Sequence, residues 1–242
     1  MAKPTPDHIR YHDIPRISAN DLARYMVASE TGKLGIIRRS RESVTATRIR
    51  YTAVRPPLRS FLADQNRPKS IIHTTRQMFE QRADDASLKD FAREDAKLSI
   101  DVLDAFMRMQ NQLGGIDFAP APLRQKKLEL SGVAVSVNVD LLTMRTKGSE
   151  DQVGGALFRL TKADDETEAA ATKRREIGVY AATLVQMQVR QHLAGNRKTH
   201  HAICMSIDVQ CEEVIVAPRT YSQRAQNLEN ACRFIAAMWD KA

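Results

Sequence analysis

Hydrophobic residues recur at steps of three or four through a long stretch of the first half of the chain, a spacing that is typical of an amphipathic helix. The stripe is formed by Leu88, Phe91, Leu98, Val102, Phe106, Met109 and Leu113. Ser87 precedes it as a candidate N-cap and Gly114 follows it, so the pattern predicts a helix over 88–113. Asp95 falls within the same stripe, where a carboxylate needs a partner or a metal ion.

Weaker periodic patterns predict two further helices in the N-terminal half, near 19–29 and over 70–83. Ser18, with an acid three residues later, resembles the capping box that begins a helix. The pair Pro56-Pro57 is expected to end whatever structure precedes it, because proline lacks the amide hydrogen that continues a helix or a strand.

After the prolines near residue 120 the hydrophobic period changes from 3.6 to 2, which indicates β-strands. Val133, Val135, Val137, Val139 and Leu141 alternate with small or polar residues. This alternation predicts a strand over 133–141, which a polar turn at 145–152 joins to a second strand over 153–162. The remaining patterns predict a helix over 168–194, strands over 201–209 and 213–217, and a closing helix over 221–240.

This order of elements predicts an α/β (α+β) protein, in which a mixed β-sheet is flanked by helices and preceded by a helical N-terminal half. We expect a basic helical region over 1–86 and an α/β core domain over 87–242.

Length and composition narrow the class of protein. The chain has 242 residues, of which 43% are hydrophobic, and no stretch approaches the roughly 20 apolar residues that a membrane helix needs. Residues 1–16 lack the apolar core of a signal peptide, and three cysteines without paired spacing suit a reducing compartment. These features predict a cytoplasmic protein that does not enter a membrane.

The net charge of +8 is concentrated at the N-terminus. Residues 1–60 hold 12 basic and 5 acidic side chains, a net of +7, whereas 61–130 are neutral and 131–242 carry +1. Lysine and arginine gain affinity for a polyanion by releasing its counterions, so this segment is a candidate phosphate-contacting surface. Its candidate nucleic-acid-binding residues are Lys33, Arg38, Arg39, Arg41, Arg48 and Arg50. The alternatives are a solvated basic face, or arginines paired with the acidic stretch 84–104.

Candidate catalytic chemistry rests on four residues. Asp140 ends the polar face of the first strand, where a sheet margin could expose it as a ligand for Mg²⁺. Lys162 ends the second strand and could orient a water molecule or stabilise a phosphoryl oxygen. Glu94 and Asp95 on the long helix would complete the site, with Asp140 and Glu94 as metal ligands.

The order of these residues resembles the core of the PD-(D/E)XK nucleases, and most closely their RecB-like branch. The matching stretches are SGVAVSVNVDLL (131–142), VGGALFRLTK (153–162) and REIGVYAATL (175–184). In the last, Glu176 and Tyr180 occupy the positions where that branch often carries Gln-x-x-x-Tyr. The family places an acid two residues before the catalytic lysine, but here that residue is Leu160, and Asp208 is a candidate replacement.

The missing acid favours a protein that binds nucleic acid, DNA in preference to RNA, on a degenerate PD-(D/E)XK-like core and through its basic N-terminal segment. An active Mg²⁺-dependent RecB-like nuclease is the alternative, and Mg²⁺ is expected only in that case. A further alternative is a protein-interaction or assembly subunit of a larger complex, whose basic segment docks an acidic partner.

Overall fold

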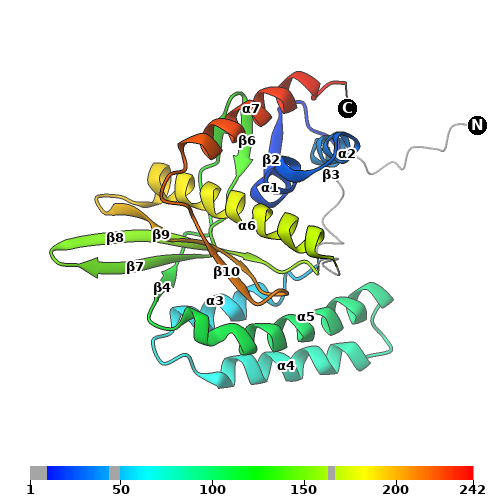
Figure 1. Ribbon diagram of the computed structural model, residues 1–242. Helices are drawn as coiled ribbons and strands as arrows, with labels where there is room; N and C mark the ends of the chain where they lie inside the picture. The colour runs from blue at the N-terminus through cyan, green and yellow to red at the C-terminus, as the bar shows by residue number, and fades with distance from the viewer. Residues whose placement is uncertain (1–9, 44–49, 163–166, 242) are drawn as a thin grey trace, which may run out of the picture.

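The computed structural model describes residues 10–43, 50–162 and 167–241. Its centre is a five-stranded mixed sheet in the order β10-β9-β8-β7-β4 (Figure 1). The strands are β4 (Asp117–Pro120), β7 (Leu141–Lys147), β8 (Glu150–Arg159), β9 (Lys198–Asp208) and β10 (Glu213–Val216). Neighbouring strands are antiparallel except β8 and β9, which run parallel. The predicted mixed sheet flanked by helices is confirmed.

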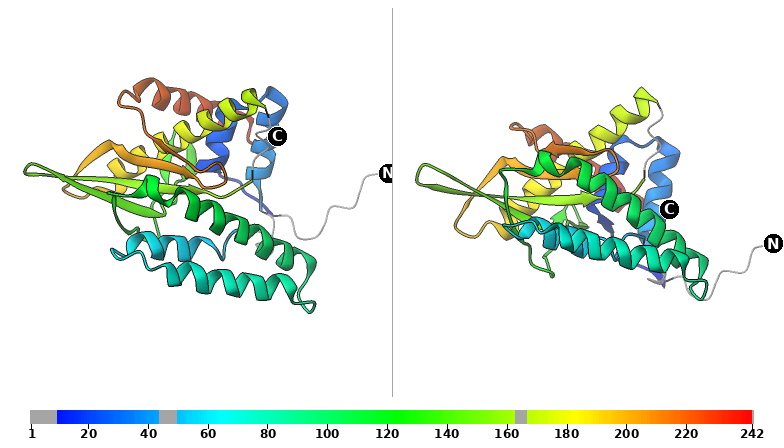
Figure 2. Two further views of the ribbon diagram at one scale, coloured as in Figure 1. Left: turned by 60° about the horizontal axis from the view of Figure 1, so that its bottom comes forward. Right: turned by 90° about the horizontal axis from the view of Figure 1, so that it is seen from below.

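The parallel pair of strands requires a crossover, and α6 (Glu168–Gln188), extended by a π-helical turn over Val189–Leu193, provides it. On the same side of the sheet lie α1 (Ala19–Val27), α2 (Glu30–Arg41) and α7 (Ser222–Met238). The opposite side is covered by α3 (Arg55–Ala63), α4 (Lys69–Asp84) and α5 (Asp90–Met109), the last ending in a 3-10 turn over Gln110–Leu113 (Figures 1 and 2). Each side has its own hydrophobic cluster.

A second, three-stranded sheet lies on the α6 side and consists of β2 (Arg16–Ser18), β6 (Val133–Ser136) and β5 (Leu128–Leu130). Ser131 and Gly132 join β5 to β6 with φ angles of 46° and 83°, as a two-residue type I′ hairpin requires. β1 (Arg10–Tyr11) precedes the first two helices, β3 (Glu42–Ser43) follows them, and the two short strands pair with each other.

The predicted strand over 133–141 is wrong, because the chain leaves the small sheet after β6 and enters the large sheet only at β7. Val137 and Val139 remain buried in this connection, which preserves the alternation without strand pairing. The side chain of Gln125 takes the place of a neighbouring strand, since it bonds both the amide and the carbonyl of Val139.

The helices predicted near 19–29 and over 70–83, 88–113, 168–194 and 221–240 are confirmed within a few residues at their ends. Ser18 caps α1 as expected, accepting the amide of Asp21 at 3.1 Å. Ser87 is not the N-cap of α5. It bonds to Asp85 instead, and the helix begins after Lys89.

Two helices were not predicted. α2 buries only Ile36 and Ile37 and so shows no apolar stripe, and α3 carries Pro56 and Pro57 in its first turn, where proline is tolerated.

The division after residue 86 stays a prediction. Both hydrophobic clusters combine residues from before and after that position. Within the described part of the chain, no helix has the length and apolar character needed to cross a membrane.

Candidate nucleic-acid interface

Asp140, the expected ligand for Mg²⁺, lies immediately before β7 with only 4% of its surface exposed. Its Oδ2 atom accepts the amide of Phe158 at 2.8 Å and lies 2.5 Å from Nη1 of Arg55. The expectation of an exposed carboxylate is wrong, because the amide of Asp140 donates to Ala156 and so holds the residue against β8. Asp140 thus joins α3 to the sheet.

Glu94 and Asp95 lie on α5 and both contact the segment that leads into α3. Oε2 of Glu94 accepts Nη2 of Arg50 at 2.7 Å, and the same guanidinium lies over the ring of Phe91. Oδ1 of Asp95 accepts the amide of Tyr51 at 2.9 Å. Asp95, the carboxylate within the apolar stripe, therefore has a backbone partner. Arg50 pairs with the acidic stretch 84–104, as one of the two alternatives for the basic segment predicted.

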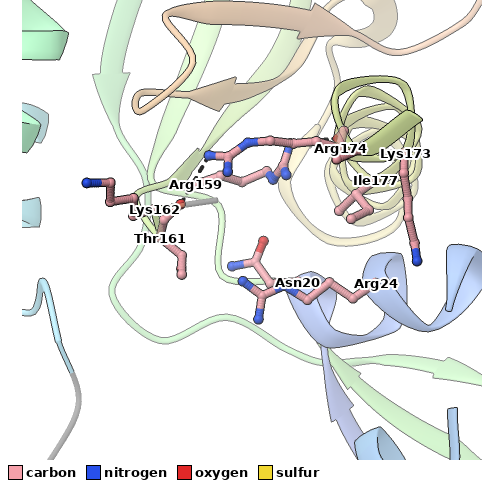
Figure 3. A pocket seen from close by; sticks show the side chains of 9 residues that line it. Asn20, Arg24, Arg159, Thr161, Lys162, Lys173, Arg174 and Ile177 are labelled. Carbon is pink, nitrogen blue, oxygen red and sulfur yellow. Dashed lines mark hydrogen bonds between the residues drawn. The ribbon is translucent and has the colours of Figure 1, made fainter. Parts of the chain in front are cut away.

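Lys162 was expected to end the second strand, but β8 ends at Arg159 and Lys162 lies exposed three residues beyond it. Its backbone amide donates to the hydroxyl of Tyr51, a bond that partly offsets the upward effect of burial on the pKa of that tyrosine. In Figure 3 its ammonium group points away from Arg159 and Arg174.

The four candidate catalytic residues do not share one site. Asp140 lines one cavity and Lys162 lines another, while Glu94 and Asp95 line neither. Among the described residues, no three His, Cys, Asp or Glu side chains gather closely enough to hold a metal ion. Asp140 and Glu94 do not fit a Mg²⁺ site, because each already binds an arginine from a different part of the chain.

The candidate phosphate-contacting residues divide into paired and exposed groups. Lys33 pairs with Glu30 at 2.7 Å, and Arg41 lies 3.6 Å from Asp240. Arg38 and Arg39 are exposed in the last turns of α2. Arg48 lies outside the described residues. Among the described members of this candidate set, Arg38 and Arg39 are thus the most accessible to a phosphate backbone.

A cavity of about 380 Å³ opens where α1, the end of β8 and the beginning of α6 meet (Figure 3). It is lined by Asn20, Arg24, Arg159, Thr161, Lys162, Ala170, Lys173, Arg174 and Ile177. Five of these nine side chains are basic and none is acidic. Figures 1 and 2 show α2 on the same side of the molecule as the beginning of α6, so the basic segment and the basic cavity lie on one side.

Two nearly buried arginines form one wall of this cavity. The side chains of Arg159, from β8, and Arg174, from α6, are 11% and 9% exposed and lie side by side (Figure 3). Asp208 pairs with both, binding Arg174 through two contacts of 2.6 Å and Nη1 of Arg159 at 3.0 Å. Asp208, the candidate replacement acid, therefore holds arginines in place.

Electrostatics in the cavity disfavour additional positive charge. Burial lowers the pKa of Arg159, repulsion from Arg174 and Arg24 adds to this effect, and attraction to Asp208 only partly opposes it. Arginine stays protonated at any physiological pH, so the lowered pKa means that Arg159 keeps its charge at a cost, which arises mainly from burial. An anion in the cavity would stabilise this buried charge.

No family model and no curated protein matches this chain. The site has to be interpreted from its own chemistry.

Sequence reasoning missed the arginine wall, although a signal for it exists. Arg159 is the one charged residue between Val153 and Leu160, and Asp208 is the one charged residue between Ile203 and Val209. Opposite charges in two apolar strands indicate a buried pair, and the structure places the two residues opposite each other in the parallel pairing of β8 and β9. Arg174 comes from a helix and leaves no comparable pattern.

Proposed function

We propose that the protein binds nucleic acid, DNA in preference to RNA, through phosphate contacts on the side where α1, α2 and the beginning of α6 meet, and that it does not cleave the strand. The observation that carries the proposal is the cavity with five basic side chains and no acidic one among its described lining residues. Phosphate oxygens are the groups that arginine forks bind best, and they occur at every step of a nucleic acid.

The proposal includes a core that is a degenerate relative of the PD-(D/E)XK nucleases. The β7–β8 hairpin, the crossover helix α6 and the parallel strand β9 are compatible with the resemblance. The acids that could hold a catalytic metal ion are already paired, which supports the absence of cleavage. Asp140, Glu94 and Asp208 each bind an arginine. Glu176, at the position where the RecB-like branch often has glutamine, also pairs with an arginine, Arg224.

Salt-dependent binding of labelled DNA tests this function. We expect affinity for single-stranded DNA to fall steeply as the salt concentration rises. The double variant Arg38→Ala/Arg39→Ala should make the slope of log K against log salt less steep by about 1.4, because it removes two phosphate contacts that contribute roughly 0.7 each. The matched control is Lys89→Ala/Lys97→Ala, which removes two exposed charges from the opposite side of the sheet and should leave the slope unchanged.

The other functions give different results. Cleavage of the DNA with Mg²⁺ or Mn²⁺ present, abolished by Asp140→Ala, would favour the nuclease and overturn this proposal. Failure to bind DNA or RNA at about 50 mM salt, where phosphate contacts are strong, would also overturn it and favour an assembly subunit.

A further inference from the structure

We propose that the basic cavity binds a phosphate monoester, the dianionic group found at the end of a nucleic-acid strand or on a free mononucleotide. This inference rests on the proposed function and specifies what the cavity recognises. Its volume of about 380 Å³ lies in the range of small-molecule sites.

Depth is the first argument for a monoester. The innermost donors, Arg159 and Arg174, are about nine-tenths buried, whereas Arg24 is 45% exposed. A phosphodiester within a strand has a sugar on each side, and both sugars would have to enter the cavity before the phosphate reached the buried guanidinium groups. A terminal phosphate carries one sugar and can approach end-on.

The arrangement of donors is the second argument. Figure 3 shows Arg159 and Arg174 on one side of the cavity and Asn20 and Arg24, both from α1, on the other. Thr161 adds a hydroxyl at the strand end. A monoester presents three terminal oxygens, one more than a diester, so it can accept bonds from both sides of the cavity at once.

Asn20 adds an amide donor, Nδ2, on the α1 side of the cavity (Figure 3). Its Oδ1 atom is buried and has no hydrogen-bond partner. A phosphate oxygen accepts a bond from Nδ2, whereas a carboxylate at this position would repel the phosphate.

Charge is the third argument. The second pKa of a phosphate monoester is about 6, so at neutral pH it carries close to two negative charges, while a diester carries one. Burial makes the charge of Arg159 costly, repulsion from Arg174 and Arg24 adds to this cost, and Asp208 opposes it. A dianion in the cavity would stabilise the buried charge more than a monoanion would.

The binding experiment compares three labelled oligonucleotides of about ten thymidines, a length within the range of single-strand sites, that carry a 5′-phosphate, a 3′-phosphate or neither. Thymidine 5′-monophosphate is measured alongside. We expect one phosphorylated end to bind about tenfold more tightly than the strand with two hydroxyl ends. This advantage should grow between pH 5 and pH 7.5 as the monoester becomes dianionic.

Asn20→Asp is the decisive variant. It places a carboxylate in the cavity with almost no change of shape, and it adds an acid to the first turn of α1, where the helix dipole favours one. We therefore expect the melting temperature to be kept and the tenfold advantage to be lost. The double variant Arg24→Gln/Lys173→Gln should also lose it, whereas the control Lys89→Gln/Lys97→Gln should retain it.

The outcomes separate this inference from the proposed function. If all three oligonucleotides bind equally, or if the advantage survives in Asn20→Asp, the inference is overturned while nucleic-acid binding stands. If thymidine 5′-monophosphate binds but no oligonucleotide does, the cavity chemistry is supported, its source is a free mononucleotide, and the proposed function fails.

Discussion

At the scale of single residues, the carboxylate of Asp140 accepts two donors at one oxygen, Nη1 of Arg55 and the amide of Phe158. We expect Asp140→Ala to lower the free energy of unfolding by about 3 kcal/mol, because it leaves a buried amide and a partly buried guanidinium without their acceptor. Urea unfolding measures this loss. DNA affinity of the folded variant should stay at the wild-type value.

Asp140→Asn is the matched control, since its carbonyl oxygen can still accept the amide of Phe158. Its loss of stability should be clearly smaller than that of Asp140→Ala. Equal stability of the wild type and Asp140→Ala would contradict the structural role that the contacts indicate.

The residues of the site were partly accessible from the sequence. The charge distribution drew attention to Arg38 and Arg39, and the structure shows both to be exposed. Arg55 as the partner of Asp140 and Arg174 as the second partner of Asp208 could not be predicted, because each arginine comes from a segment far along the chain.

At the scale of elements, β8 depends on two adjacent glycines where its pairing with β9 shifts register. A Cβ atom on Gly154 would overlap the carbonyl oxygen of Ile203 and come within 2.6 Å of Oγ1 of Thr143. Gly154→Ala should therefore lower the free energy of unfolding by several kcal/mol, or prevent folding, because backbone must move to make room. Thermal unfolding followed by circular dichroism measures the change.

Gly35→Ala provides the contrasting substitution. Gly35 lies inside α2, and a Cβ atom there would meet only Nη1 of Arg39 at 3.5 Å. Alanine should stabilise this helix by about 0.5–1 kcal/mol, because glycine is the poorer helix former. A stabilised Gly154→Ala, or a strongly destabilised Gly35→Ala, would contradict the register of β8 or the extent of α2.

Elements with a periodic hydrophobic face were predictable, and those without one were not. The long helix α5 follows its stripe of buried residues, whereas α2 has no such stripe. The connection 137–140 was predicted to be part of a strand because Val137 and Val139 alternate with polar residues. Both valines are buried by tertiary packing, without strand pairing. Periodicity reports burial, and burial does not require strand pairing.

At the scale of the whole molecule, the central sheet joins the two hydrophobic clusters. Leu157 and Phe158, adjacent on β8, belong to opposite clusters because successive side chains of a strand point to opposite faces. Phe158 packs edge-on against Phe106 of α5. On the other side the indole of Trp239, 1% exposed, donates to the carbonyl of His12 and closes α7 onto the N-terminal segment.

This shared sheet predicts that the two helical layers unfold together. We expect Phe106→Ala, which removes a fully buried ring from the α5 side, to lower the free energy of unfolding by about 3–5 kcal/mol. Fluorescence of Trp239 reports the α7 side, and far-UV circular dichroism reports all helices. Both urea midpoints should fall by the same amount in the variant and should coincide in the wild type. In the opposite case, the Trp239 midpoint of the variant stays at its wild-type value while the dichroism transition moves or splits. That result would show that the two helical layers unfold independently and that the sheet stays folded with the α6 side alone.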